Sequence, residues 1–384
     1  MNLQSTIIQG IQLAFQNIYN HDLPLDQISL APTRKEFQGT YTFVVFPFLK
    51  ISQANPEATA NQIGEYLKGN IEIMTGFNVV KGFLNLELNE LVWVDLFQQI
   101  YYNPSFGQLP ANGQKVMVEY SSPNTNKPLH LGHLRNNFLG FSVAEILKAT
   151  GYEVIKSNLV NDRGIHICKS MVAYQHFGSG ETPESSGLKG DHLAGKYYVI
   201  FDQEYKKEIK ELVAKGQTED EAKKNAPLLL EAQDMLRKWE ANDEEVVTLW
   251  KQMNAWVYAG FEATYKKMGV TFDKFYYESD TYLLGKDIVE EGLEKGVFFK
   301  KENGSVWVDL TDEGLDEKLV RRADGTSVYI TQDLGTADLK YKDFQIDKSV
   351  YVVGNEQDYH FDVLFKIMRK LGRSYGDGLY HLSY

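Results

Sequence analysis

The sequence predicts an α/β protein in which a parallel sheet with a long helical insertion follows a small α+β unit. Two observations lead to this prediction. Residues 116–160 show the order strand, helix, strand, and two strands joined by a crossover helix pair in parallel. From His192 to Met268 the pattern is helical and rich in charge, which is unusual inside a sheet domain. We therefore expect two domains, residues 1–110 and 111–384, with the insertion at about 165–270.

The composition is that of an ordinary globular protein. Of 384 residues, 43% are hydrophobic and 24% are charged, which excludes a disordered or low-complexity chain. The single cysteine, Cys168, excludes an intramolecular disulfide and a cysteine-rich zinc site, and it favours a reducing compartment. No apolar run reaches the roughly 20 residues that span a bilayer, and the first residues do not read as a signal peptide. We expect a cytoplasmic protein without a membrane partner.

The net charge of −12 argues against indiscriminate binding of nucleic acids, which requires a broad positive field. The charge is not uniform along the chain. Residues 115–164 contain six basic and four acidic residues, a local balance of +2. Focused contacts with phosphate groups therefore remain compatible with the sequence.

Residues 1–110 alternate between helical and strand patterns. Apolar residues recur at helical spacing from Ile7 to Ile18, so the chain is expected to open with an amphipathic helix. Asn55 followed by Pro56 is typical of an N-cap and a first helical turn, and this helix should end near Gly69. The composition of the remaining runs predicts two strands and a third helix, at 40–46, 77–88 and 91–102.

The second domain begins with a short buried strand at 116–120 and a loop at 121–128. A helix that ends at Thr150 and a strand at 153–160 follow. A polar loop at 178–191 precedes the helical insertion. Beyond it, Asn303-Gly304 and Asp324-Gly325 predict two hairpin turns. The last predicted elements are a buried strand and its following helix, at 349–353 and 361–371.

The most informative stretch, residues 119–133, lies where a parallel strand should end and a helix should begin. Ligands bind at this edge of open α/β sheets, and a helix N-terminus attracts anions. His130 and His133 share one face of the first helical turn, and Gly132 between them leaves room for a flat base. Lys127 adds a positive charge. These residues suit a nucleoside triphosphate, although a capping pair of surface histidines is an open alternative.

The common glycine-rich nucleotide motifs are absent, and the histidine spacing argues against zinc. Instead, residues 122–135, which read S-P-N-x-x-K-P-x-H-x-G-H-L-R, resemble the HIGH signature of class I aminoacyl-tRNA synthetases in its extended arginyl form. Three further stretches resemble that family in the same order: 161–164, 329–335 and 351–361. Residues 1–110 resemble its additional domain, which contacts the tRNA elbow. One departure is Gln332, where many members have arginine.

The resemblance implies a HUP-type Rossmann-like catalytic domain. It also implies a monomeric enzyme that ligates L-arginine to tRNA-Arg through an arginyl-adenylate. ATP is then a substrate, Mg²⁺ accompanies ATP, and the protein binds no metal itself. The family's KMSK loop and anticodon-binding domain would follow Tyr384, since the residues from Lys266 to Gly269 match KMSK only superficially.

By the same resemblance, Asp333 is the carboxylate for the guanidinium, Gln357 an acceptor, Tyr329 a flat wall and Glu119 a second negative charge. The full arginine-binding set is Glu119, Ser122, Asn124, His130, Tyr329, Asp333 and Gln357. The catalytic set is His130, His133 and Lys127, and the ATP-binding set is Pro123, Lys127, His130, Gly132 and His133. Tyr329 and Asp333, four residues apart, would share a face if they lie on a helix.

Simpler interpretations of these residues exist. Asp333 is also typical of a helix N-terminus, and Gln357 and His360 of a capped helix start. Two alternative functions remain open as well. The chain could bind substrates without ligase turnover, or it could be a small-molecule nucleotidyltransferase, which also uses H-x-G-H. The second alternative would not need Asp333, Gln357 or the first domain.

Overall fold

The computed structural model describes residues 3–384, which form two compact units, one up to Gly107 and one from Gln108 to Tyr384. The division lies close to residue 110, where the sequence places the domain boundary. Each unit has its own hydrophobic core. Among the helices of residues 3–384, we find none whose length and hydropathy would let it cross a bilayer.

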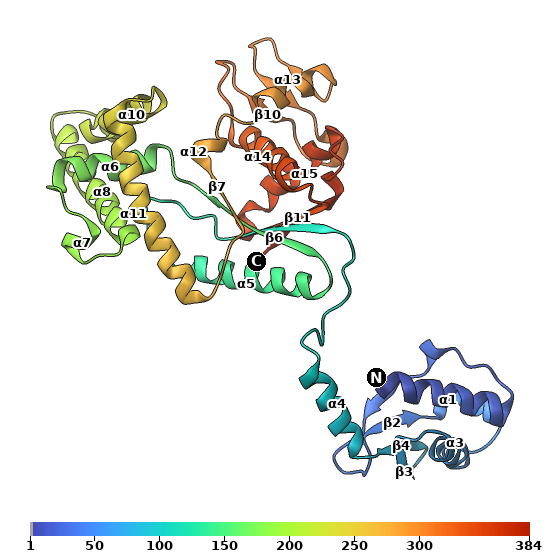
Figure 1. Cartoon of the computed structure of the whole chain (residues 1–384). Coiled ribbons are helices and arrows are strands. Elements are labelled where there is room, and N and C mark those ends of the chain that lie inside the picture. The colour runs from blue at the N-terminus through green and yellow to red at the C-terminus, as the bar shows by residue number, and fades with distance from the viewer. Residues whose placement is uncertain (1–2) are drawn as a thin grey trace. The chain divides into compact units, whose positions relative to one another are not determined.

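The first unit packs helices against an antiparallel sheet whose strands pair in the order β1-β2-β4-β3 (blue in Figure 1). Ile11 of α1, Ile63 of α3 and Leu84 of β4 are fully buried in its core. The arrangement is the expected α+β fold. Its elements are α1 (Leu3–Tyr19), β1 (Leu30–Pro32), β2 (Tyr41–Val44), α2 (Leu49–Ser52), α3 (Pro56–Asn70), β3 (Met74–Val80), β4 (Phe83–Leu88) and α4 (Leu91–Tyr102).

Most predictions for this unit are confirmed, including the cap of α3, where the Asn55 side chain accepts the backbone N–H of Ala58 at 2.7 Å. The single strand predicted at 77–88 is wrong, because two strands, β3 and β4, share this region. Lys81 and Gly82 join them with φ angles of 49° and 81°. A two-residue turn of this kind reverses the chain without interrupting the apolar alternation, and Lys-Gly lacks the usual asparagine or aspartate signal.

The second unit is built on a parallel five-stranded sheet of order β12-β11-β5-β6-β7. Met117 of β5 packs toward α14, and the next residue, Val118, packs toward α5. The two helices therefore cover opposite faces of the sheet, as expected for this α/β class. The elements are β5 (Lys115–Glu119), α5 (Leu131–Ala149), β6 (Glu153–Val160), β7 (Lys274–Tyr277), α14 (Tyr329–Phe344), β11 (Lys348–Val353), α15 (Asp358–Lys370) and β12 (Leu379–Ser383).

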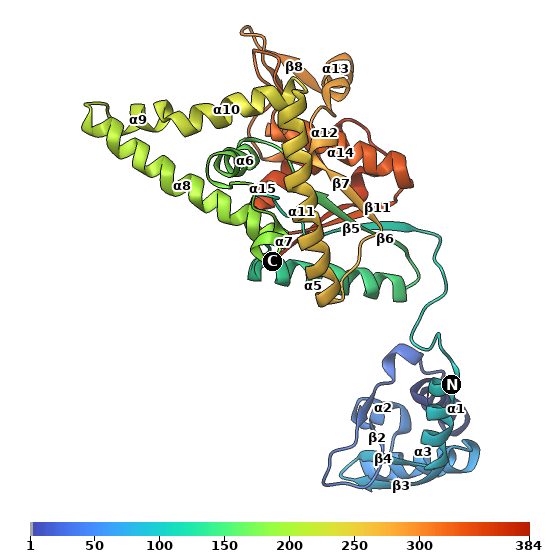
Figure 2. The same ribbon diagram turned by 60° about the vertical axis from the view of Figure 1, so that its left-hand side comes forward.

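The helical insertion forms a bundle between β6 and β7, as Figures 1 and 2 show. Its long helices pack on one another around buried side chains such as Met171, Phe201 and Met253. The insertion was predicted as helical, and the structure confirms it. The helices are α6 (Ile165–Phe177), α7 (Pro183–Ser186), α8 (Gly190–Ala214), α9 (Glu219–Asn225), α10 (Pro227–Glu240) and α11 (Glu244–Met268).

A small antiparallel sheet of order β10-β9-β8 lies between β7 and α14 in the sequence. Asn303-Gly304 joins β8 and β9, which confirms the first predicted hairpin. At Asp324-Gly325 the predicted turn forms and is closed by an antiparallel bridge from Arg321 to Ser327, but no second strand follows, because α14 begins at Tyr329. The elements are α12 (Glu278–Thr281), α13 (Lys286–Glu294), β8 (Phe298–Lys300), β9 (Val306–Val308) and β10 (Lys318–Arg321).

Candidate active site

The loop after β5 brings polar groups to the carboxyl ends of the parallel strands. Ser121 and Ser122 have φ angles of 76° and 43°, in the left-handed region that non-glycine residues rarely adopt. Two buried amides hold this backbone: the N–H of Ser121 donates to Asn136 Oδ1 at 2.6 Å, and that of Ser122 to Asn158 Oδ1 at 3.1 Å. The strain is thus sustained by contacts from α5 and β6, as is common at functional sites.

The structure brings most of the predicted arginine-binding residues together. A cavity of about 410 Å³ lies between β5, α14 and α15, and ligand pockets of about 300–1,000 Å³ are typical. His130, which was assigned to the same set, does not line this cavity. The six predicted residues that line it are Glu119, Ser122, Asn124, Tyr329, Asp333 and Gln357.

Helix α14 supplies one wall of this cavity, which we call the arginine cavity after the predicted residues that line it. Tyr329, Asp333, Thr336 and Lys340 all line it, at spacings of four, three and four residues that place them on one helix face. The ring of Tyr329, in the first turn of α14, is 75% exposed. The predicted shared face of Tyr329 and Asp333 is therefore confirmed.

Asp333 has a partner from the next helix. Nε2 of His360, in the first turn of α15, lies 2.6 Å from Oδ2 of Asp333. This contact orients one oxygen of the carboxylate, Oδ2. His360 lies inside one of the four motifs, but from the sequence it is interpreted as part of a helix start, because its partner Asp333 is 27 residues away.

Glu119 differs from the expectation. It was predicted to add a second negative charge, but its Oε2 atom lies 2.6 Å from Nζ of Lys340. Only 5% of Glu119 and 2% of Lys340 are exposed. Lys340 therefore compensates the charge of Glu119. Sequence reasoning missed Lys340, although its position seven residues after Asp333 on a helix is a usable signal.

Glu278 is a carboxylate that sequence reasoning also missed. It begins α12 directly after β7, and thus at the same edge of the sheet as the predicted residues. Burial raises its pKa to about 7, while the positive charge of Arg163 acts in the opposite direction. Near neutral pH this group can therefore exchange a proton or accept a cationic ligand.

The two histidines of the H-x-G-H segment cap α5. Nδ1 of His130 accepts the backbone N–H of Gly132 at 3.1 Å, and Nδ1 of His133 accepts that of His130 at 3.1 Å. Both neutral rings therefore carry their proton on Nε2, from which they can donate. Burial, with His130 and Lys127 nearby, lowers the pKa of His133 to about 4, so its ring is neutral at pH 7.

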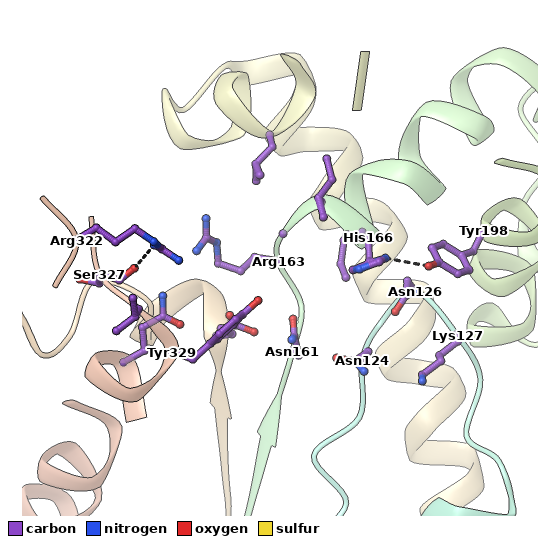
Figure 3. Close-up of a pocket in the computed structure, with 17 residues that line it drawn as sticks. Asn124, Asn126, Lys127, Asn161, Arg163, His166, Tyr198, Arg322, Ser327 and Tyr329 are labelled. Atoms are coloured by element: carbon purple, nitrogen blue, oxygen red, sulfur yellow. Dashed lines mark hydrogen bonds between the residues drawn. The ribbon is translucent and has the colours of Figure 1, made fainter. Parts of the chain in front are cut away.

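A second cavity of about 520 Å³ shares part of its lining with the first. Figure 3 shows residues that line this second cavity. Three cationic side chains line it, those of Lys127, Arg163 and Arg322. His166 also lines it, and Nδ1 of His166 lies 2.9 Å from the hydroxyl of Tyr198.

Lys127 is the one member of the predicted ATP-binding set that lines this second cavity. Pro123, His130, Gly132 and His133 line neither cavity. The residues shared by both cavities are Asn124, Asn161, Glu278, Tyr329 and Gln332.

The second motif, at 161–164, fixes the insertion to the site. Asp162, which is 1% exposed, accepts the Tyr258 hydroxyl of α11 at 2.9 Å. Its carboxylate also accepts the backbone N–H and the hydroxyl of Ser279, at 2.9 and 2.8 Å. Burial raises the pKa of Asp162, and these hydrogen bonds oppose that effect. Asp162 thus supports the site without lining either cavity.

Within residues 3–384, no cluster of three or more histidine, cysteine, aspartate or glutamate side chains is arranged to hold a metal ion. The side chains at the candidate site are instead donors and paired carboxylates, which suit an organic ligand with both charged and neutral groups.

Comparisons with known proteins agree with this geometry. Residues 98–383 match the family model described as tRNA synthetases class I (R), catalytic domain. An arginine–tRNA ligase of Amoebophilus asiaticus is 63% identical over 384 residues, which cover 100% of this chain and 64% of that protein. An arginine–tRNA ligase of Bacteroides fragilis is 58% identical over 386 residues, covering 100% of this chain and 65% of that protein. The chain thus spans just under two thirds of the length of these relatives.

Solved structures show the same fold. Thermus thermophilus arginyl-tRNA synthetase superposes with a TM-score of 0.63 at 21% identity, covering 100% of this chain and 65% of that chain. The Plasmodium falciparum arginyl-tRNA synthetase gives 0.58 at 17% identity, with the same coverage. The Rossmann-like catalytic fold is therefore confirmed. Because the family model spans most of the sequence, the chain belongs to the class I tRNA synthetases, in the group designated R.

Proposed function

We propose that this chain carries the arginine-activating site of an enzyme that ligates L-arginine to tRNA-Arg through an arginyl-adenylate. One observation carries the proposal: six residues, assigned to arginine from the sequence, line a single cavity of about 410 Å³. They come from segments that are distant in the sequence. The names of the full-length relatives support the same activity.

Recognition of the substrate follows from the chemistry of a guanidinium, which is planar, always charged and rich in donors. In our proposal Asp333 accepts its N–H groups, and Gln357 offers a neutral acceptor. The exposed ring of Tyr329 forms a flat wall. Glu278 contributes further negative charge near neutral pH. Ser122 and Asn124 would bind the α-amino and α-carboxylate groups.

ATP would bind at the N-terminus of α5. The Nε2–H groups of His130 and His133 and the ammonium of Lys127 are donors suited to phosphate oxygens. Pro123 and Gly132 would lie against the nucleotide. Mg²⁺ would arrive with ATP, held by its phosphate oxygens rather than by a set of protein carboxylates.

The proposed reaction consists of two displacements. The carboxylate of arginine attacks the α-phosphorus of ATP, and pyrophosphate leaves. A ribose hydroxyl of the terminal tRNA adenosine then attacks the carbonyl carbon of the adenylate, and AMP leaves. No protein nucleophile is required, so the chain acts by positioning and by stabilising charge. Residues 1–110 would contact the tRNA elbow, and the enzyme would act as a cytoplasmic monomer.

Ligand-induced stabilisation of the 384-residue chain tests the proposal. L-Arginine at 100 times its dissociation constant should add about 2.7 kcal/mol to the free energy of unfolding. Citrulline and L-lysine are the controls, because the first lacks the charge of arginine and the second lacks its planar fork. Stabilisation by arginine alone supports the proposed pocket. Equal stabilisation by all three ligands, or by none, would contradict it.

Turnover is a separate question. Pyrophosphate release that depends on arginine, ATP and tRNA would show that this chain is active by itself. Arginine binding without any release would favour the alternative of a substrate-binding fragment. No feature of the structure favours the small-molecule nucleotidyltransferase, which would not require the cavity lined by Asp333 and Gln357.

A further inference from the structure

The proposed function assigns no role to Lys340, which forms a buried ion pair with Glu119. Both residues line the arginine cavity, and their charged atoms lie 2.6 Å apart. Lys340 lies two helical turns beyond Asp333 on the same face of α14, so one wall of the cavity carries an anion and a cation. The Nζ atom of Lys340 also lies 4.6 Å from the ring centre of Tyr351.

Each member of the pair keeps the other charged. A carboxylate as deeply buried as Glu119 is costly without a partner, and Lys340 is its one ion-pair partner within residues 3–384. Burial lowers the pKa of Lys340, but the attraction of Glu119, together with that of Tyr351 and Asp333, more than offsets burial, and the pKa lies above its ordinary value. The pair is therefore zwitterionic and adds no net charge to the cavity.

The compensation of Glu119 by Lys340 determines which carboxylate would attract a guanidinium. With Glu119 compensated, the negative charge facing a guanidinium comes from Asp333 and Glu278. Without Glu119, the ammonium of Lys340 would stand unpaired beside the same space and would repel any cationic substrate. Removal of Lys340 alone would leave Glu119 as a buried, unpaired carboxylate.

On the basis of the proposed function, we propose that Lys340 is a positioning residue for arginine recognition. It holds Glu119 as a fixed acceptor of compensated charge and leaves Asp333 as the anion that selects the guanidinium. The other titratable groups that face the pair are Asp333 on α14, Tyr351 on β11 and Tyr276 on β7. They are unchanged in every variant below, so comparisons between variants isolate the pair.

The decisive experiment measures L-arginine affinity by calorimetry in two variants. Glu119→Gln leaves Lys340 unpaired, and we expect the affinity for L-arginine to fall by about tenfold or more, which corresponds to about 1.4 kcal/mol. The double variant Glu119→Gln/Lys340→Met removes the opposing cation as well. It should bind arginine better than the single variant, because the opposing cation is gone, but more weakly than the unaltered chain, which keeps Glu119 as a fixed acceptor. If the substitutions acted only by loss of packing, the double variant would instead bind L-arginine more weakly than the single variant.

The pH profile is a second readout. In Lys340→Met, Glu119 loses its ion-pair partner, and burial then favours the protonated carboxyl, which must release its proton when the guanidinium binds. Arginine affinity relative to the unaltered chain should therefore rise with pH, by up to about tenfold per unit. Lys340→Arg preserves the charge and should parallel the unaltered chain. Urea unfolding checks that each variant is folded, and the double variant, which contains no unpaired buried charge, remains informative if Lys340→Met does not fold.

The outcomes separate the two proposals. If the unaltered chain binds arginine but the double variant binds no better than Glu119→Gln, this inference is overturned and the proposed function stands. The inference would also be overturned if the pH dependence of arginine affinity in Lys340→Met paralleled that of the unaltered chain. If the unaltered chain does not bind arginine, the proposed function fails and this inference fails with it.

Discussion

Four side chains of the arginine cavity form two close pairs. His360 contacts one oxygen of Asp333, and Lys340 contacts one oxygen of Glu119. Such contacts fix the remaining oxygen of each carboxylate in space. A ligand then meets oriented acceptors rather than mobile ones, which reduces the entropic cost of binding.

Asp333→Ala tests the central residue. Truncating one partner of a buried charge pair typically costs 2–5 kcal/mol, so L-arginine affinity should fall by roughly that amount. The measurement is the dissociation constant from calorimetry. Lys342→Ala is a matched control on the same helix, because Lys342 is exposed and does not line the cavity. A dissociation constant unchanged in Asp333→Ala would overturn the assignment of the pocket.

At the scale of elements, the helical insertion is tied to the sheet through one buried carboxylate. Asp162, directly after β6, receives the Tyr258 hydroxyl from α11 and two hydrogen bonds from Ser279 in α12. Its backbone carbonyl also accepts the indole N–H of Trp250 at 2.6 Å. Helices α11 and α12 thus both contact a residue that lies at least 88 positions earlier in the sequence.

Tyr258→Phe tests this attachment. The substitution keeps the ring but removes a donor to a buried carboxylate, so the free energy of unfolding should fall by about 1–3 kcal/mol. Urea denaturation measures the change. The control is Tyr198→Phe, which removes the hydroxyl that contacts His166 in an exposed setting and should cost less. Equal losses in the two variants would mean that the bond to Asp162 has no special weight.

At the scale of the whole molecule, charge is distributed unevenly. The chain carries a net charge of −12, yet Lys127, Arg163 and Arg322 line one cavity beside the arginine cavity. Arg163 is paired with Glu240 at 2.7 Å, whereas Lys127 and Arg322 make no ion pair among residues 3–384. An RNA partner would therefore meet focused positive charge on an otherwise acidic surface.

We accordingly expect tRNA to bind this chain weakly and with a steep dependence on salt. The logarithm of the affinity should fall by about 0.9 per phosphate contact for each tenfold increase in salt. Fluorescence anisotropy with labelled tRNA at several salt concentrations measures the slope. L-Arginine affinity at the same concentrations is the control. Tight binding that salt does not weaken would be evidence against phosphate contacts as the main source of affinity.

Much of the secondary structure could be predicted because it depends on neighbours in the sequence. The cap at Asn55, the βαβ pattern and the helical insertion all arise from spacings of a few residues. The predictions that differ from the structure concern chain reversals. The turn at Lys81-Gly82 lacks a local signal, and the turn at Asp324-Gly325 gives way to a helix where a second strand was expected.

The α/β class, the four ordered motifs and six of the residues that line the arginine cavity follow from the sequence. Which charges meet depends on the tertiary structure. It paired Lys340 with Glu119 and His360 with Asp333, and it added Glu278. The physical reason is range: local patterns report interactions within a helical turn or a strand, whereas a buried ion pair joins elements whose approach depends on packing of the whole sheet.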